Sequence, residues 1–421
     1  MKKIYVIIGI IASVIVVVFA GLLIYNAVIN ANKQSDPGNT QKNYQEASSE
    51  TEIPAYAVIF NDESFEQIVR TGLRKKTGDI YNTELIKIES VIIFGAERHK
   101  ENTDTLNEDN KYNYDSIKIT SITGYGKINA LDDIIYMPNI RRLIIDEQDI
   151  TDISPLKGLS NLELLSLCRF QIADLSPLEN LTSLTWLDLN SNHISDISPL
   201  KSLFKLTTLG LNSNQISDIQ GLEALGNLTD LDLSRNIITD ISPLKGLPQL
   251  TMLSLSNNQI SDISALGELV NLTNLELDNN KITDINGLDN LFNLTLLNLM
   301  DNQVTDLSPL KDLSNLNFLI LSGNKVKDIS PLKNLTNLTH LYLLQNQVSD
   351  ISALNGLNKL SVLNLAYNQI TDISALKDLT NLRNLDLSGN PLSYEQVDEL
   401  QKALPNCNIV FINNPTRSSE N

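Results

Sequence analysis

A repeat of 22 residues runs through most of the sequence and leaves few folds open to it. Asparagines recur at this interval at Asn192, Asn214, Asn236, Asn258, Asn280, Asn302, Asn324, Asn346, Asn368 and Asn390. Aspartates recur in parallel at Asp152, Asp174, Asp196, Asp218, Asp240, Asp262, Asp284, Asp306, Asp328, Asp350 and Asp372. A fixed period of about 20 to 29 residues with regularly placed leucines is the signature of a solenoid, in which each unit packs only against its neighbours. We therefore expect one elongated stack instead of several globular domains.

The first half of each unit predicts a short strand. The unit is N-L-x-x-L-x-L-x-x-N-x-I-x-D-I-S-P-L-x-x-L-x, and residues 293–314 show it in full. Leu297 and Leu299 alternate with other side chains, which is the period of a strand with one buried face. Stacked units should therefore form one parallel sheet of about a dozen strands on the inner, concave side. The asparagine that follows should take left-handed backbone and hydrogen-bond neighbouring main chain, forming a ladder along the stack.

The second half of the unit predicts a tight return on the outer side. In D-I-S-P-L, Ser308 is a good N-cap and Pro309 suits the first helical position. Few residues remain before the next strand, so only a short 3₁₀ or helical turn fits. The expected fold class is an α/β repeat solenoid shaped like a horseshoe, with a parallel sheet on its concave side and short 3₁₀ turns on its convex side.

The repeat weakens toward the N-terminus, where a cap is expected. Gln148 and Phe170 stand where later units have asparagine, and a degenerate first repeat covers about residues 116–138. Residues 60–76 place Phe65, Ile68, Val69 and Leu73 on one helical face, with Asp62 as a plausible N-cap. A polar loop is expected at residues 101–114. We assign residues 56–115 to a helical N-terminal cap and residues 116–391 to the repeat array.

A second cap is expected at the C-terminal end of the array. Residues 394–404 have a helical pattern, and the stretch LPNCNIVF after it supplies a last strand that closes the stack. This cap covers residues 392–413. Cys168 and Cys407 lie some ten repeats apart, which at about 4.8 Å per strand is much too far for a disulfide.

The N-terminus predicts attachment to a membrane. Residues 4–28 are apolar and uncharged, a length that can cross a bilayer core, and Lys2 and Lys3 precede them. A positive flank stays in the cytoplasm, so the repeats should lie outside. A cleaved signal peptide is the alternative, but its apolar core usually runs only about 7 to 15 residues. We therefore assign residues 1–31 to a transmembrane signal anchor, and the polar residues 32–55 to a flexible stalk.

The charge of the chain narrows the class of partner. The net charge is −18, whereas a nucleic-acid-binding protein needs a basic stripe for phosphate contacts. A basic or neutral protein partner fits better. The alternative is that the acidity only keeps a long solenoid soluble.

The sequence lacks the usual signs of catalysis. His99, His193 and His340 have no metal-ligand spacing between them, and no phosphate-binding loop or hydrolase motif is present. We expect no catalytic residue, no metal site and no cofactor. Carboxylates do gather on the expected concave face, at Asp188, Asp230, Asp232, Glu276 and Asp278. Paired carboxylates can hydrolyse glycosides or hold calcium, but an acidic strip facing a basic partner is the favoured interpretation.

Four later strands predict an apolar patch on the same face. The residues that flank the inward leucines there are Leu296, Met300, Phe318, Ile320, His340, Tyr342, Leu344, Val362, Ala366 and Tyr367. A contiguous patch with Phe, Tyr and Met has the composition of an interface core. We expect this patch, together with the acidic strip, to bind a protein ligand. A homodimer contact, or simple β-propensity on a solvated strand, would produce the same pattern.

These units resemble the internalin type of bacterial leucine-rich repeat, over about residues 60–411. The motif D-I-S-P-L in a 22-residue unit carries the resemblance, and residues 59–80 resemble the helical cap of such proteins. The units are also similar to phosphatase-regulator repeats of that length. The internalin resemblance implies binding of host or other proteins through the concave sheet. No immunoglobulin-like domain and no L-P-x-T-G sorting signal follow the repeats.

The function expected from these features is extracytoplasmic protein binding by a membrane-anchored, cell-surface solenoid. Adhesion or an interaction with host or envelope proteins is favoured. The alternative is a structural or regulatory module of the cell envelope that binds a self-partner.

Overall fold

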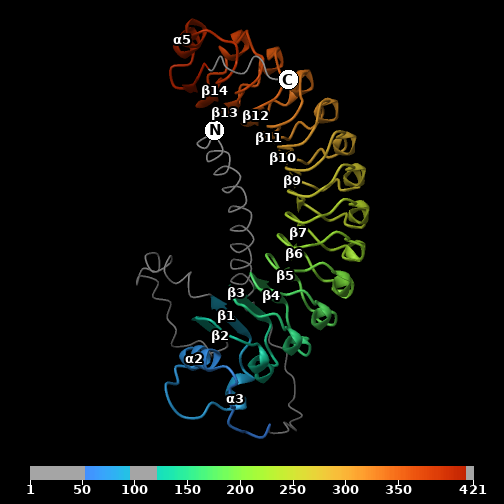
Figure 1. Cartoon of the computed structure of the whole chain (residues 1–421), viewed down its shortest axis with the longest axis vertical. Coiled ribbons are helices and arrows are strands. Elements are labelled where there is room, and N and C mark those ends of the chain that lie inside the picture. The colour runs from blue at the N-terminus through green and yellow to red at the C-terminus, as the bar shows by residue number, and fades with distance from the viewer. Residues whose placement is uncertain (1–52, 95–120, 414–421) are drawn as a thin grey trace, which may run out of the picture. The chain divides into compact units, whose positions relative to one another are not determined.

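The computed structural model describes residues 53–94 and 121–413 (Figure 1). Nearly all of them belong to one compact unit that starts at Ala55. The expected signal anchor, the stalk up to residue 52 and the polar loop at residues 101–114 lie outside the described residues. Among the helices that are described, none has the length and apolarity to cross a bilayer.

The described strands form one parallel sheet of 15 strands. Their bounds are β1 Ser90–Phe94, β2 Ser121–Tyr125, β3 Arg142–Asp146, β4 Leu164–Cys168, β5 Trp186–Asp188, β6 Thr208–Gly210, β7 Asp230–Asp232, β8 Met252–Ser254, β9 Asn274–Glu276, β10 Leu296–Asn298, β11 Phe318–Ile320, β12 His340–Tyr342, β13 Val362–Asn364, β14 Asn384–Asp386 and β15 Asn408–Val410. From β3 to β15 the spatial order is the chain order.

Each unit returns through a short 3₁₀ turn, and these turns line the outer side of the curved stack while the strands line its inner side (Figure 1). The turns are η2 Asp132–Tyr136, η3 Ser154–Leu156, η4 Ser176–Leu178, η5 Ser198–Ser202, η6 Leu222–Ala224, η7 Ser242–Gly246, η8 Ser264–Glu268, η9 Asn286–Leu288, η10 Ser308–Leu310, η11 Ser330–Asn334, η12 Ser352–Leu354 and η13 Ser374–Leu376. The expected α/β horseshoe with a concave parallel sheet is confirmed.

The repeat period sets the register and builds the core. Leu297 pairs with Leu319, which pairs with Leu341, so equivalent leucines of consecutive units lie side by side. All three are 0% exposed. Burying a leucine is worth about 1.5 to 3 kcal/mol, and each unit gains this only because a neighbour covers it.

The asparagine ladder is present. The side-chain amide of Asn280 donates to the carbonyls of Leu255 and Leu277, both at 3.0 Å, and its Oδ1 accepts from the Ile260 N–H at 3.0 Å. Each such asparagine therefore ties its own unit to the preceding one. Gln148 occupies the equivalent position near the N-terminal end and makes an equivalent hydrogen bond, because its Oε1 accepts from the Ile128 N–H at 2.9 Å.

The expectation that the ladder asparagine has left-handed backbone is wrong. Positive φ falls on the residue before it, as at Asn279 with φ of 54°. The equivalent residues share this conformation along the stack: Glu147, Arg169, Ser191, Ser213, Arg235, Asn257, Asp301, Gly323, Gln345, Tyr367 and Gly389. The chain turns one residue earlier, which leaves the asparagine side chain pointing inward to its bonding partners.

The expected cap of the outer turn is also corrected. Ser308 is the first residue of η10, and the residue before it supplies no side-chain cap. The repeated aspartate caps the turn instead, because Asp306 Oδ1 accepts from the Ser308 N–H at 2.8 Å. The Ser308 hydroxyl donates to the other oxygen of the same carboxylate, also at 2.8 Å. This explains the aspartate series that runs through the sequence.

A second set of asparagines ties the units together where the strands begin. Asn293, the first residue of its unit, donates at 2.9 Å to the carbonyl of Val270, the residue just before the first residue of the preceding unit. Asn227 does the same to Phe204 at 2.7 Å. Two N-L-T sequences of the chain thus use their asparagines in packing between units.

The N-terminal cap contains the expected helix in shortened form. Helix α2 spans Glu63–Gly72, and Asp62 caps it by accepting from the Ser64 N–H at 2.8 Å. Phe65, Ile68 and Val69 are buried on one face, as predicted, whereas Leu73 is only partly buried. A one-turn helix, α3, spans Asn82–Leu85.

The strand order in this cap differs from a simple continuation of the repeats. Strand β1 lies between β2 and β3 and pairs with both, so β2 forms the outer edge of the sheet. The first degenerate repeat therefore does not place its strand beside the next one. Its return segment still packs as expected, with Ile128, Ile134 and Met137 each at 1% exposed or less.

The helix and the last strand that were predicted near the C-terminus are both present. Helix α5 spans Tyr394–Ala403 and begins with a capping box formed by Ser393 and Gln396. Strand β15 then adds to β14 and ends the described sheet. Cys168 and Cys407 are both free, as their separation requires.

Candidate functional site

The concave face carries the candidate site as columns of equivalent residues. The middle column consists of the residue between the two leucines of each strand, and equivalent residues on neighbouring strands pair directly. From β5 to β12 it contains Asp188, Gly210, Asp232, Ser254, Glu276, Asn298, Ile320 and Tyr342. Because the strands stack in order, residues 22 apart in sequence become neighbours in space.

The apolar patch is centred on three rings from two neighbouring strands. The Phe318 and His340 rings stack with their centroids 4.8 Å apart and their planes inclined by 24°. Tyr342 lies 5.6 Å from Phe318, inclined by 39°. All three side chains are half-buried, and Leu296, Met300 and Val362 have the same intermediate exposure. The predicted neighbours therefore form one contiguous aromatic surface.

Three of the expected patch residues contribute little accessible surface. Ile320 and Ala366 are each 1% exposed and Leu344 is 7% exposed, although none of them belongs to the core cluster. They lie on the concave side, yet solvent hardly reaches their side chains. Alternation along the strand predicts the face of a residue correctly, but not how much of it solvent reaches.

Tyr367, the last aromatic residue of the patch, lies close to Gly389, which was not among the predicted site residues. Gly389 has φ of +71°, and a Cβ placed on it would lie 2.7 Å from Tyr367 Cδ1. A larger residue at this position would have to displace the Tyr367 ring from where it lies. Gly323, with φ of +72°, likewise gives room to the Asp301 side chain. The sequence does contain a sign of these two positions, because glycine replaces a larger residue one position before the ladder asparagine.

The acidic strip occupies the neighbouring strands β5 to β9. Asp188 is 8% exposed, and burial raises its pKa to about 6, although the Asn190 N–H donates to it at 3.1 Å. Burial also raises the pKa of Asp232, against hydrogen bonds from Ser234 and Asn212 and the charge of Arg235. Burial raises the pKa of Asp230 as well, partly offset by the Thr229 hydroxyl.

Glu276 is a second carboxyl group of the strip with a strongly raised pKa. Burial, followed by the charges of Asp278 and Asp232, raises its pKa to about 7. The Ser254 hydroxyl donates to Oε2 at 3.2 Å, whereas Oε1 is buried without a hydrogen-bond partner among the described residues. Asp278 is better satisfied, since the side-chain amides of Asn279 and Asn298 both donate to it at 2.9 Å.

The strip does not have the arrangement of a metal site. Within residues 53–94 and 121–413, no three or more His, Cys, Asp or Glu side chains are placed to hold one metal ion. The carboxylates lie in a row on every second strand, β5, β7 and β9, instead of converging. His340, the one histidine of the candidate site, stacks on Phe318, and burial lowers its pKa.

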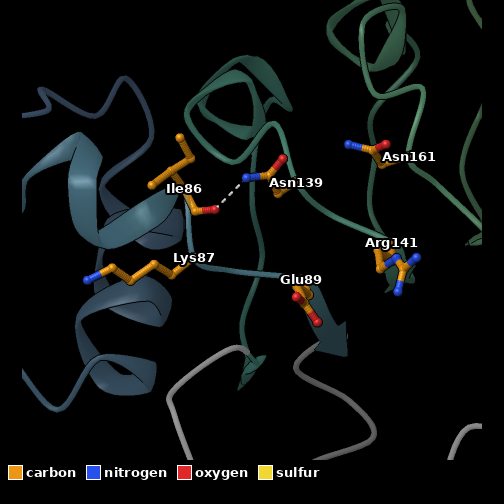
Figure 2. A pocket seen from close by; sticks show the side chains of 6 residues that line it. All are labelled: Ile86, Lys87, Glu89, Asn139, Arg141 and Asn161. Atoms are coloured by element: carbon orange, nitrogen blue, oxygen red, sulfur yellow. Dashed lines mark hydrogen bonds between the residues drawn. The ribbon is translucent and has the colours of Figure 1, made fainter. Parts of the chain in front are cut away.

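A pocket outside the concave face lies where the N-terminal cap meets the first units (Figure 2). It is lined by Ile86, Lys87, Glu89, Asn139, Arg141 and Asn161. Two of its polar side chains bond to neighbouring groups of the protein. Asn139 donates to the Ile86 carbonyl at 2.8 Å, and Arg141 pairs with Glu163 at 3.0 Å. We therefore place the candidate site on the concave face.

The sequence matches the family described as leucine-rich repeats (2 copies), at residues 160–202, 182–220, 204–246, 248–290, 292–334, 314–356 and 358–402. The comparison with curated proteins finds no match.

Comparison with solved structures narrows the type of repeat protein to which the chain belongs. An internalin (InlF) from Listeria monocytogenes is 34% identical with a TM-score of 0.74, and the match covers 85% of this chain and 97% of that one. A leucine-rich-repeat protein of Leptospira interrogans is 30% identical with a TM-score of 0.66, covering 69% and 77%. The functional domain of InlJ from Listeria monocytogenes is 24% identical with a TM-score of 0.52, covering 64% and 62%, and shows the fold alone. The chain belongs to the leucine-rich-repeat family and is a repeat protein of the internalin type.

Proposed function

We propose that this chain is a cell-surface binding protein that holds a protein ligand on its concave sheet and catalyses no reaction. The observation that carries the proposal is the aromatic cluster of Phe318, His340 and Tyr342. The centroids of the His340 and Tyr342 rings lie 4.8 and 5.6 Å from the centroid of the Phe318 ring. No other described element covers this face of the sheet (Figure 1). Half-buried aromatic side chains in a contiguous patch are the usual anchors of protein interfaces.

The acidic strip next to this cluster supports a protein ligand with a basic surface. The strip concentrates part of the chain's net charge of −18 on the concave face. Such a field speeds the association of a basic partner and repels nucleic acid. The aromatic cluster would then supply most of the affinity, and the strip the orientation.

Site-specific photo-crosslinking tests which face binds the ligand. A photoreactive amino acid replaces Val362 in the aromatic patch of the full chain, displayed on its native cells. A matched variant carries it at Phe292, which is 51% exposed in the turn between η9 and β10. We expect a discrete adduct with a second protein from position 362 and none from position 292. Adducts from position 292 alone would place the interface outside the concave sheet, and an adduct with a second copy of the chain would favour the self-partner.

The location at the cell surface is part of the proposal and rests on residues 1–31. Lys2 and Lys3 before an apolar stretch predict that the repeats lie outside the membrane, tethered by this segment. Protease added to intact cells should then degrade the repeat array while a cytoplasmic marker survives. An array that survives along with the marker would contradict the outward orientation.

A further inference from the structure

The middle column of the concave face alternates carboxylates with small residues from β5 to β9. Asp188 pairs with Gly210, Gly210 with Asp232, Asp232 with Ser254 and Ser254 with Glu276. Within β5 to β9, each carboxylate of the column therefore has only glycine or serine as its neighbours. This alternation is not required by the fold, because the same column contains Ile320 and Tyr342 farther along.

The spacing of these carboxylates fits an α-helix. Neighbouring strands lie about 4.8 Å apart, so carboxylates on every second strand lie about 10 Å apart. An α-helix rises about 1.5 Å per residue, so seven residues advance by about 10.5 Å and return to the same helical face. The helix turns between two such positions would lie over Gly210 and Ser254, where the side chains are smallest.

The strip also lacks the ion pairs that buried carboxylates usually require, although the charge of Arg235 lowers the pKa of Asp232. No ion pair between described residues includes Asp188, Asp232 or Glu276. Glu276 is 5% exposed, and its Oε1 has no donor among the described residues. A buried oxygen of this kind costs free energy until a donor reaches it. An incoming ammonium or guanidinium group would supply the ion pair that these carboxylates lack.

The backbone of the sheet favours a helix over an extended segment. Strands β5 to β9 each pair with a neighbour on both sides, so their main-chain groups are already used. An extended peptide lying across them would find no main-chain partners, whereas a helix satisfies its own. A helix docked by one face onto a concave surface is also a common mode of recognition.

We propose that the acidic strip binds a basic α-helical segment of the protein ligand, which crosses strands β5 to β9 with Lys or Arg at every seventh position. These cationic side chains face Asp188, Asp232 and Glu276 in turn. The inference rests on the proposed function, because it names the kind of ligand that the concave sheet takes.

Two synthetic helical peptides of identical composition test it against the full chain. One has Arg at positions i, i+7 and i+14, and the other has the same three Arg at i, i+5 and i+10. We expect the first peptide to bind at least tenfold more tightly by isothermal titration calorimetry. Glu276→Gln and Asp232→Asn should each reduce its affinity toward that of the second peptide. Asp386→Asn is the matched control, since Asp386 belongs to the same column on β14, outside the strip.

Equal affinities for the two peptides would overturn the inference and leave only unspecific attraction to a chain of net charge −18. Unchanged binding in the Glu276→Gln variant would also overturn it, provided that circular dichroism shows a native fold. Neither result contradicts the proposed function, because the contribution of Phe318 and Tyr342 to the binding affinity is measured separately with the native ligand. If replacing Phe318 and Tyr342 leaves the affinity for the native ligand unchanged while the two peptides still differ, the ligand site is not at the aromatic patch and the inference about the strip stands.

Discussion

Carboxylates of this chain occupy two opposite environments, one on each side of the solenoid. On the outer turns, Asp306 accepts hydrogen bonds from the N–H and hydroxyl of Ser308, which lower its pKa. On the concave face, Glu276 is buried beside Asp278 and Asp232, and its pKa rises to about 7. The first group favours folding when it is charged, and the second opposes folding when it is charged.

Replacing Glu276 should change how stability depends on pH. Its folded pKa of about 7 lies above the ordinary 4.5, so the charged form destabilises the fold above about pH 7. This penalty declines as the pH falls through 7 and is gone below about 4.5. Asp188, with a pKa of about 6 against 3.8, acts in the same direction.

We expect Glu276→Gln to unfold at a higher urea concentration than the native chain at pH 8 and at nearly the same concentration at pH 4.5. Asp386→Asn serves as the control for a carboxylate-to-amide change on the same face. A Glu276→Gln variant whose urea midpoint follows that of the native chain at both pH values would show that this carboxyl group is not strained by burial.

Removing one rung of the asparagine ladder should destabilise the array. In Asn280→Ala, the carbonyls of Leu255 and Leu277 lose a donor and the Ile260 N–H loses its acceptor. Unsatisfied buried main-chain groups cost about 1 to 3 kcal/mol, and we expect a loss of this size in urea unfolding. Asn290→Ala is the matched control, because Asn290 is exposed and its amide bonds only to Asp289. Equal losses in the two variants would rule out a stabilising ladder.

At the scale of the element, the 3₁₀ turn depends on its aspartate. Asp306→Ala removes the cap of η10, and we expect a loss of about 0.5 to 1 kcal/mol at pH 7, the low end for a cap because the site is exposed. The folded pKa lies below the ordinary 3.8, so this contribution is present above about pH 4 and is lost as the pH falls through the folded pKa. Urea unfolding at pH 7 and pH 2 checks this.

Asp312→Ala, in the exposed loop after the same turn, is the control for removing a surface carboxylate. A deficit of Asp306→Ala that persists unchanged at pH 2 would show that the carboxylate does not act through its charged, hydrogen-bonded form.

The strands and turns could be predicted because the period encodes them directly. Leucines equivalent to Leu297 and Leu299 alternate with other residues in unit after unit. Asp306 and its equivalents mark the returns, and several of these also contain Ser-Pro, as at Ser308 and Pro309. The left-handed residue could not be placed in the same way, since its position holds residues as different as Arg169, Ser213 and Tyr367. The position of β1 between β2 and β3 could also not be predicted from the sequence, because no repeat relates Ser90–Phe94 to the units that follow.

At the scale of the whole molecule, the period also predicts which residues share the concave face. Phe318, His340 and Tyr342 could be brought together from their spacing alone, because residues 22 apart pair on neighbouring strands. The burial of Ile320 and Leu344 and the raised pKa of Glu276 could not be predicted. They depend on how the side chains of three strands fill the space between them, and a period says nothing of that.

The affinity of the native ligand for two aromatic variants tests the central claim most directly. We expect Phe318→Ala and Tyr342→Ala each to weaken binding by at least about 2 kcal/mol, roughly thirtyfold, as the loss of a buried anchor does. Phe292→Ala, at an exposed aromatic residue away from the concave face, should leave the affinity unchanged. Native affinity in both Phe318→Ala and Tyr342→Ala, with the fold intact, would contradict a ligand site at the aromatic patch of the concave sheet.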